Sequence, residues 1–386
     1  MNKTRNILMA SAALCVVLTV GVAANAADLP KSTQQMLKEL KFSPDDKLFA
    51  NMDQEASSAP AAMVDAANKE GILNISGSIN EDEFRKLVAP FKERFPKITV
   101  KYFSGDQNSR NIKPLLAYKS GTILVDIIEG LGVNLADYKA AGALTKIDDL
   151  PNVKNIPPDI HDPDGFWVAP RLRYWCMTYN TDKVKKEDLP KTWDDLLTDT
   201  KLYNGHLGIV NRPNDFMIML WGAKGPAWSN NFMDKLFDVV KPQFRKEGSD
   251  SVTGLVAAGE IDVGMPLASY RTWQYYKKGA PVSWHCPEPV PLSFSAMVVI
   301  NKSPHTNAAK LYVNWFLSKE AQLAQYYSDG SPPIHKDMQD PHFLLYADEI
   351  VGKKMAPRNP NLLEQDMPTV AKIWDAHWQK ASGTSR

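Results

Sequence analysis

Two adjacent residues with binding chemistry, Tyr270 and Arg271, lie where the sequence predicts that a buried strand passes into a helix. In the segment GMPLASYRTWQYYKKGAPV, Ser269 is the predicted helix cap, and a lysine-rich stop precedes Gly279. A helix start presents unpaired backbone N–H groups with a partial positive charge, and a guanidinium adds a forked hydrogen-bond donor. Together these groups suit a carboxylate or a phosphoryl group.

Other predicted strand-to-helix turns also carry polar residues at their tips. In open α/β sheets, ligands bind at the carboxyl ends of the strands, so these tips are candidate ligand contacts. For any one of them, an ordinary cap or turn is the alternative role. The candidates at these tips are Ser76, Ser78, Glu129, Asn211, Arg212, Ser249, Ser269, Tyr270 and Arg271.

Recognisable catalytic signatures are absent from the sequence. The segment GLGVNL at 130–135 lacks the third glycine of a dinucleotide loop, and there is no P-loop, nucleophile-elbow serine or CxxC motif. The seven histidines include no pair at metal-ligand spacing. We therefore expect a binding protein and not an enzyme, without catalytic residues, cofactor or metal. A secreted hydrolase or transferase is the alternative from another class.

The first 26 residues have the three parts of a cleavable secretory signal. Lys3 and Arg5 precede an apolar run, and Ala24, Asn25 and Ala26 form a small-residue cleavage site. No later stretch approaches the ~20 apolar residues that a membrane span needs. We expect an exported, soluble protein in which residues 27–65 form an N-terminal helical extension with no assigned role.

Length and charge narrow the class of protein further. The chain has 386 residues, which is too long for one ordinary core and suggests two domains of roughly 150 residues each. Its 45 Lys and Arg nearly balance 44 Asp and Glu, so the net charge of +1 gives no reason to expect nucleic acid as a partner. Cys176 and Cys286 remain after the signal; they could form a disulfide or remain two buried thiols.

From Gly71 onward, predicted strands alternate with helices. Strands at 72–75 and 98–102 flank a helix that Asn80 and Glu83 open with a capping-box signature, which makes a βαβ unit. The alternation predicts an α/β fold whose sheets are covered by helices on both faces. Further strands are predicted within 122–130, 173–180, 259–265 and 294–301, and further helices at 192–197 and 307–322.

Four segments resemble successive blocks of bacterial extracellular solute-binding proteins of the ferric-iron-binding type, which serve ABC importers. The segments are DPDGFWVAPRLRYWCMTYNTDKV, LPKTWDDLL, AAGEIDVGMPLASYRTWQYYKKGAPV and AMVVINKSPHTNAAKLYVNWFLSKEAQ. The resemblance extends from about Gly71 to Pro333. It implies a two-lobed type II periplasmic binding fold, in which each lobe is a mixed, mainly parallel sheet flanked by helices and crossing strands form the hinge.

The resemblance also implies how the chain divides and where it works. Lobe 1 is expected at 66–171 plus 292–340, and lobe 2 at 172–291 plus 341–386, with one ligand in the cleft between them. The protein is then expected in the periplasm, as a monomer that delivers its ligand to an inner-membrane ABC permease.

In the iron-binding members of this family, a pair of tyrosines supplies phenolate ligands to Fe³⁺. The pair falls here on Tyr270 and Arg271, and a guanidinium cannot coordinate Fe³⁺ and would oppose a trivalent cation. The resemblance also places Arg171 and Arg173 at the crossing between the lobes and Arg212 in the anion loop. A surface ion pair is the alternative role of these arginines.

We therefore expect the ligand to be a small organic anion, namely a carboxylate, a phosphonate or a phosphorylated compound. The alternative ligand is Fe³⁺ with a synergistic anion, held by Tyr270 and Glu129.

Overall fold

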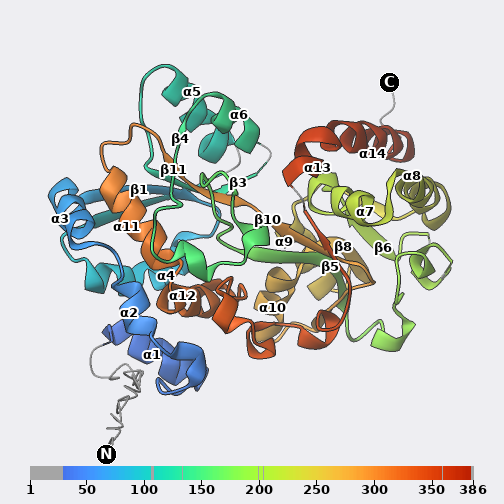
Figure 1. Ribbon diagram of the computed structural model, residues 1–386. Coiled ribbons are helices and arrows are strands. Elements are labelled where there is room, and N and C mark those ends of the chain that lie inside the picture. The colour runs from blue at the N-terminus through green and yellow to red at the C-terminus, as the bar shows by residue number, and fades with distance from the viewer. Residues whose placement is uncertain are drawn as a thin grey trace, which may run out of the picture.

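The computed structural model describes residues 29–105, 108–132, 134–198, 200–202, 204–358 and 360–383. The predicted signal peptide lies outside these residues. Figure 1 shows two α/β halves side by side, with the strands β5 and β10 at their junction. We call the part built on the five-stranded sheet the first half and the part built on the seven-stranded sheet the second half.

The sheet of the first half is mixed and has the strand order β2-β1-β3-β11-β4. The pairs β1–β2 and β1–β3 are parallel, whereas β11 runs antiparallel to both β3 and β4. The chain therefore returns late in the sequence to complete this sheet. The strands are β1 (Ile72–Gly77), β2 (Thr99–Ser104), β3 (Ile127–Leu131), β4 (Leu144–Thr145) and β11 (Ala296–Ile300).

The sheet of the second half has the order β12-β10-β5-β8-β6-β7, and β9 also pairs with β5. Here β5 is antiparallel to β8, β9 and β10, whereas β6 is parallel to β7 and β8. The strands are β5 (Leu172–Asn180), β6 (Leu207–Val210), β7 (Gln243–Arg245), β8 (Val263–Ala268), β9 (Val282–His285), β10 (Val290–Phe294) and β12 (Met355–Pro357).

Helices surround both sheets (Figure 1). Those of the first half are α1 (Lys31–Leu40), α2 (Met52–Ala56), α3 (Ala61–Glu70), α4 (Glu81–Arg94), α5 (Lys113–Lys119), α6 (Leu135–Ala140), α11 (Thr306–Phe316) and α12 (Lys319–Asp329). Those of the second half are α7 (Met217–Lys224), α8 (Pro226–Lys235), α9 (Ser249–Ala257), α10 (Ser269–Lys277), α13 (Pro360–Gln365) and α14 (Met367–Ala381).

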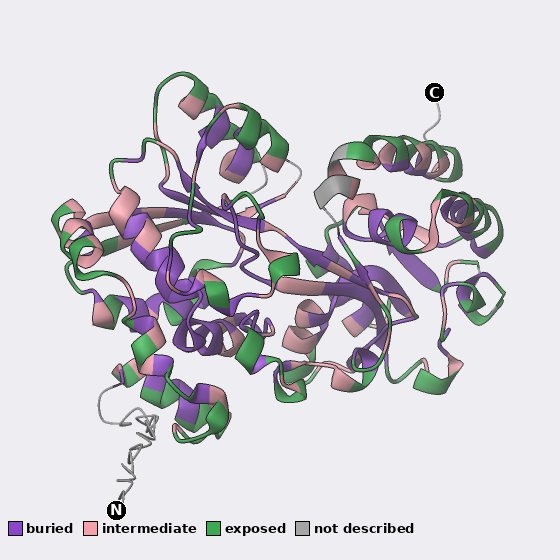
Figure 2. Ribbon diagram, viewed as in Figure 1, coloured by how far each residue is buried: buried purple, intermediate pink, exposed green. Residues whose placement is uncertain are grey.

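Buried side chains lie on both faces of each sheet. In the first half, one cluster joins α4, α11 and α12 to β1, and another packs Ile128 and Val298 against the opposite face. In the second half, a large cluster around Trp193 and Trp374 faces a smaller one around Val252. Figure 2 shows these buried residues along the strands and the inner helix faces. The predicted coverage of both sheet faces is confirmed.

The capping box predicted at the start of α4 is present. Asn80 Oδ1 accepts a hydrogen bond from the Glu83 backbone N–H at 2.8 Å, and Glu83 Oε2 accepts one from the Asn80 N–H at 3.2 Å. The carboxylate of Glu83 is thereby fixed over the first turn of the helix.

Three predictions about helices were wrong. The helix predicted at 307–322 is two helices, because α11 ends at Phe316 and Ser318 caps the next helix by accepting from the Ala321 N–H at 3.5 Å. The predicted helix at 192–197 is only a 3₁₀ turn at Asp195–Leu197, although its cap bonds form. Ser269 is the first residue of α10 and not its cap; the cap position is Ala268, and no side chain caps this helix.

Cys176 and Cys286 form a disulfide, which is one of the two alternatives that the sequence left open. Cys176 lies in β5, and Cys286 follows the neighbouring strand β9. Their Cα atoms are 5.1 Å apart, and both residues are fully buried. The bond therefore ties two adjacent strands of the second half together across 110 residues of sequence.

The N-terminal extension, described from residue 29, is helical and belongs to the first half. Met36, Phe49 and Met52 are buried in the same cluster as α11 and α12. The buried carboxylate of Glu320 accepts from Thr33 Oγ1 at 2.8 Å and from Arg94 Nε at 2.6 Å, which ties α1, α4 and α12 together. No helix in the described part of the chain has the length and apolar character needed to span a membrane.

Candidate functional site

A cavity of about 350 Å³ lies between the two halves, at the ends of the strands that face the junction. The first half and the junction contribute Ser78, Arg110, Asn111, Gly130, Gly132, Arg173, Trp175, Ser293, Phe294 and Ser295. The second half contributes Arg212, Asn214, Asp215, Gly248, Ser249, Asp250, Tyr270, Arg271 and Arg358. A ligand in this cavity would therefore contact both halves at once.

Positive charge dominates this cavity. Five arginines line it, at positions 110, 173, 212, 271 and 358, against the two carboxylates of Asp215 and Asp250. An arginine side chain stays protonated in proteins, so the excess of three positive charges is permanent. The whole chain carries a formal charge of only +1, so this charge is concentrated at the cavity. Such a site attracts anions and repels free metal cations.

The ring of Tyr270 contacts two of these arginines. The guanidinium carbon of Arg173 is 5.1 Å from the centre of the tyrosine ring, and that of Arg271 is 5.0 Å from it. Both distances are those of cation–π contacts. The tyrosine ring therefore stabilises two of the guanidinium groups that line the cavity.

Arg271 is half-buried at the start of α10 and has partners on its own side of the cavity. Its Nη1 donates to Gln274 Oε1 at 2.8 Å, and its Nε lies 3.8 Å from Asp250 Oδ1. Burial lowers the pKa of Arg271, but the nearby Tyr270, Asp250 and Glu83 outweigh burial and raise it. The group is a fixed cation whose orientation is set by the helix that carries it.

Asp215 holds the other arginines of the second half. Arg212 Nη1 is 2.9 Å from Asp215 Oδ2, and Arg358 Nη1 is 3.1 Å from Asp215 Oδ1. Arg358 also donates through Nη2 to the carbonyl of Phe294. Its Nε–H is buried, and the described residues offer it no acceptor. An anionic oxygen in the cavity could supply that acceptor.

Helix α9 also begins at the cavity wall. Gly248, Ser249 and Asp250 at its start line the cavity, and this nine-residue helix directs its first N–H groups out of its N-terminal end. The hydroxyl of Ser249 is buried, and no partner for it is found among the described residues. Helix starts of this kind favour negative charge.

Of the predicted site residues, six line the cavity, namely Ser78, Arg173, Arg212, Ser249, Tyr270 and Arg271. The other five, Ser76, Glu129, Arg171, Asn211 and Ser269, do not line it. Ser76 and Ser269 are buried in the strand and helix that carry them.

Arg171 and Glu129 form a buried ion-pair network beside the cavity. Arg171 Nη1 is 3.2 Å from Glu129 Oε2, and its Nε is 3.1 Å from Asp329 Oδ2. The second oxygen of Glu129 accepts from Tyr312 Oη at 2.9 Å, and burial raises the pKa of that tyrosine well above its ordinary value. Asn211 is likewise engaged, because its Oδ1 accepts from Trp374 Nε1 at 2.9 Å.

Sequence reasoning missed the arginines Arg110 and Arg358. Arg110 lies in the irregular turn Asn108–Ile112, and Arg358 follows β12 in the last thirty residues of the chain. Neither follows a strand-to-helix pattern, and Arg358 lies beyond the segment that resembles the family. Their positive charge was the only signal in the sequence, and charge alone does not distinguish them from surface arginines.

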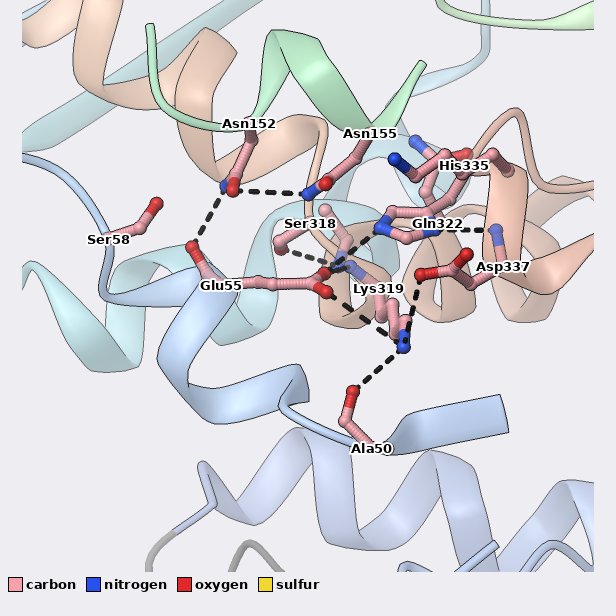
Figure 3. Close-up of polar contacts among 12 residues, drawn as sticks. Ala50, Glu55, Ser58, Asn152, Asn155, Ser318, Lys319, Gln322, His335 and Asp337 are labelled. Carbon is pink, nitrogen blue, oxygen red and sulfur yellow. Dashed lines mark hydrogen bonds and ion pairs between the residues drawn. The ribbon is translucent and has the colours of Figure 1, made fainter. Parts of the chain in front are cut away.

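A separate group, Glu55, His335 and Asp337, has the residue types of a metal site (Figure 3). His335 Nδ1 accepts from the Asp337 backbone N–H at 3.1 Å, so the ring proton is on Nε2, which faces Glu55 Oε2 at 3.1 Å. The ammonium of Lys319 lies 3.9 Å from each of the two carboxylates. This group is an ion-pair network that holds α2 against α12.

Comparisons with known proteins identify the fold. The family model described as bacterial extracellular solute-binding protein matches residues 77–323. Iron-bound HitA from Pseudomonas aeruginosa aligns at 19% identity with a TM-score of 0.65, over 79% of this chain and 99% of that one. A search of curated proteins gave no match.

Two further solved structures align equally well. An ABC transporter substrate-binding protein from Bradyrhizobium japonicum aligns at 15% identity with a TM-score of 0.66, over 80% of this chain and all of that one. The Trichodesmium protein IdiA (FutA), in complex with iron and citrate, aligns at 18% identity with a TM-score of 0.64, over 80% of this chain and 99% of that one. At such identities the alignments show the fold alone, which is that of the type II periplasmic binding proteins.

Proposed function

Since the chain belongs to the bacterial extracellular solute-binding protein family, we propose that it captures a small organic anion between its two halves for uptake by an ABC importer. The family works outside the inner membrane, which implies a periplasmic location. We further propose that the protein is a monomer and that its partner is an inner-membrane permease. The proposed lobes are 66–171 with 292–340 and 172–291 with 341–386, connected through β5 and β10.

The observation that carries the proposed ligand class is the excess of arginine in the cavity. Five guanidinium groups face two carboxylates, and two helices, α9 and α10, begin at the wall. Two or three charge-assisted hydrogen bonds, at about 1.5–3 kcal/mol each, together with desolvation of the cavity, approach the roughly 8 kcal/mol of a micromolar complex. A carboxylate, a phosphonate or a phosphorylated compound fits these donors.

Aromatic side chains at the wall suit a ligand with a flat part. Tyr270 and Trp175 both line the cavity, and the guanidinium of Arg212 lies 5.4 Å from the ring of Trp175. A planar group of the ligand could pack on the exposed part of the Tyr270 ring while the arginines bind its anionic group.

Ferric iron with a synergistic anion is the second candidate, and the comparisons favour it over the anion alone. The names of the HitA and FutA structures include iron, and that of FutA also includes citrate. In this chain Tyr270 offers one phenolate at the cavity, whereas Glu129 is buried against Arg171 and is not available as a ligand. An anionic ferric chelate would reconcile the arginines with iron, because the arginines would bind the chelating anion.

A thermal-shift screen of the mature protein separates the candidates. The probes are citrate, inorganic phosphate and a sugar phosphate, each with and without Fe³⁺. A ligand present at 100 times its Kd stabilises the folded state by about 2.7 kcal/mol and so raises the melting temperature. A rise in melting temperature with the anion alone supports the organic-anion proposal. A shift that requires iron, together with a visible phenolate-to-iron absorbance band, supports the ferric alternative. Chemical conversion of the probe would instead indicate an enzyme.

A further inference from the structure

A side-chain hydrogen bond crosses between the two halves next to the cavity. Gln274, on α10 of the second half, donates through Nε2 to Glu83 Oε1, on α4 of the first half, at 2.8 Å. The two residues are 191 positions apart in the sequence. Glu83 is buried, with 9% of its surface exposed, and Gln274 is half-buried, so water competes little for this bond.

Both partners of this bond are held by further contacts. The second carboxylate oxygen of Glu83 accepts from the Asn80 N–H, so the group is fixed by the capping box of α4. Gln274 Oε1 accepts from Arg271 Nη1 at 2.8 Å. A reversed amide would place its NH₂ against the guanidinium and its oxygen against the carboxylate, so these charges allow one orientation only.

Helix α10 touches the first half at a second point. The ring of Trp273 lies against Gly330, where a side-chain carbon would come within 3.3 Å of Trp273 Cε3. Gly330 ends α12 with φ at +74°, so a residue other than glycine would be strained there as well. Figure 1 shows α10 and α12 facing each other below the junction of the halves. Helix α10, which carries Arg271, therefore contacts the first half at both Glu83 and Gly330.

We propose that Gln274 is a positioning residue that couples the approach of the two halves to the orientation of Arg271 in the cavity. With the halves together, Glu83 fixes the amide of Gln274, and the amide oxygen directs the guanidinium of Arg271. Separation of the halves breaks the bond to Glu83 and leaves that amide free to rotate, so Arg271 loses its fixed acceptor. The inference rests on the proposed function, because it concerns how the same cavity binds an anion.

The test replaces the amide of Gln274 by a carboxylate, and a second variant then exchanges the residue types at positions 83 and 274 to restore the hydrogen bond. Gln274→Glu sets a carboxylate against Glu83, and like charges repel at this distance. The exchange Glu83→Gln with Gln274→Glu restores a donor and an acceptor, and glutamine also serves in a capping box. Gln379→Glu, at an exposed position of α14, makes the same chemical change away from the cavity.

We expect Gln274→Glu to weaken the binding of citrate or inorganic phosphate by about tenfold, mainly through faster dissociation. The exchange should recover most of that loss, and Gln379→Glu should leave affinity unchanged. The radius of gyration of ligand-free Gln274→Glu, measured by small-angle X-ray scattering, should exceed that of the wild type, and the exchange should reverse the increase.

Wild-type affinity and wild-type dimensions in a folded Gln274→Glu variant would overturn the coupling. If that variant does not fold, Gln274→Ala removes both bonds of the amide, and unchanged affinity and dimensions would again overturn it. If the wild type binds neither probe, the proposed anion function fails, whereas an expanded Gln274→Glu and its reversal by the exchange would still support the contact between the halves.

Discussion

Arg271 contacts groups from two neighbouring elements of the second half. Its guanidinium packs on Tyr270, donates to Gln274 on the same helix and lies close to Asp250 at the start of α9. With the two halves together, these contacts fix the side chain, which reduces the entropy lost on binding. The same residue is only partly buried, so its loss should have little effect on the folded state.

We predict that Arg271→Ala abolishes anion binding and changes the melting temperature of the ligand-free protein only slightly. Arg271→Lys should keep the charge but lose the forked donor, and so bind more weakly than the wild type. Arg245→Ala is the matched control, because Arg245 pairs with Glu247 outside the cavity. Calorimetric titration with citrate and phosphate measures the effect. Wild-type affinity in Arg271→Ala would exclude this residue from the site.

A second residue-scale prediction concerns the buried carboxylate of Glu349. Lys186 and Lys353 approach it at 2.7 and 2.9 Å, and it also accepts from the Cys286 N–H at 3.2 Å. Burial raises the pKa of Glu349, but the hydrogen bonds from His285 and the two lysines outweigh burial and hold it well below its ordinary value. The folded state therefore favours the ionised form, and this carboxylate stabilises it above the ordinary pKa of about 4.3.

Glu349→Gln should accordingly destabilise the protein at pH 7, by about 1.5–3 kcal/mol, the value of a hydrogen bond to a charged group, because the partner lysines are partly exposed. The difference from the wild type should shrink as the pH falls below about 4, since the carboxylate of the unfolded wild-type chain then takes up a proton while that of the folded state stays ionised. Thermal unfolding between pH 3 and pH 7 measures both effects. Glu260→Gln, at an exposed position, should show no such dependence. A constant difference across this pH range would contradict the prediction.

At the scale of elements, local signals predicted some boundaries well and others poorly. The capping box at Asn80 and Glu83 was predictable because it depends on residues three apart. The break between α11 and α12 was missed because apolar residues run through it, and the cap at Ser318 is a single hydroxyl. The antiparallel position of β11 depends on partners more than 150 residues away, which no local pattern contains.

The difference between local signals and contacts between distant residues also explains which residues of the candidate site were predicted. Residues at strand-to-helix turns, such as Ser78, Ser249 and Tyr270, were predicted to meet because the carboxyl ends of strands gather at one edge. Arg358 reaches the cavity only because β12 pairs with β10, which is a tertiary contact. Arg171 has the same residue type and lies near the crossing strand, yet a buried acidic partner directs it away.

The disulfide allows a prediction at the same scale. It closes a loop of 110 residues, and such a link is worth about 4.7 kcal/mol in the chain-entropy model. We predict that the double variant Cys176→Ala, Cys286→Ala unfolds at a markedly lower denaturant concentration than the wild type. Unreduced protein without the first 26 residues should show no free thiol in denaturant. Two reactive thiols in unfolded, unreduced protein would contradict the bond.

In the molecule as a whole, positive charge is concentrated at the cavity, so anions are attracted there and not to the surface in general. Five arginines meet at the cavity, although the entire chain is almost neutral. A neutral exterior does not attract anions in general, whereas the field inside a narrow cleft is focused by its low-dielectric walls. Ligand capture should therefore depend on short-range steering near the entrance.

We predict that the association rate of a small dianion falls as salt rises, by roughly tenfold between 0.01 and 0.15 M, where the screening length drops from about 30 to about 8 Å. The dissociation rate should change much less, because salt screens the enclosed contacts poorly. Stopped-flow measurement of tryptophan fluorescence separates the two rates. An association rate that does not depend on salt would show that the arginines do not guide the ligand into the cavity.

The position of β11 between β3 and β4 has a consequence for biosynthesis. The first half is not complete until residues 296–300 have been made, so it cannot finish folding while the ribosome is still adding the second half. Until then β3 has an open edge, which invites pairing with another nascent chain. Truncated products that end before this strand should therefore accumulate as insoluble aggregates and not as a folded, independent unit.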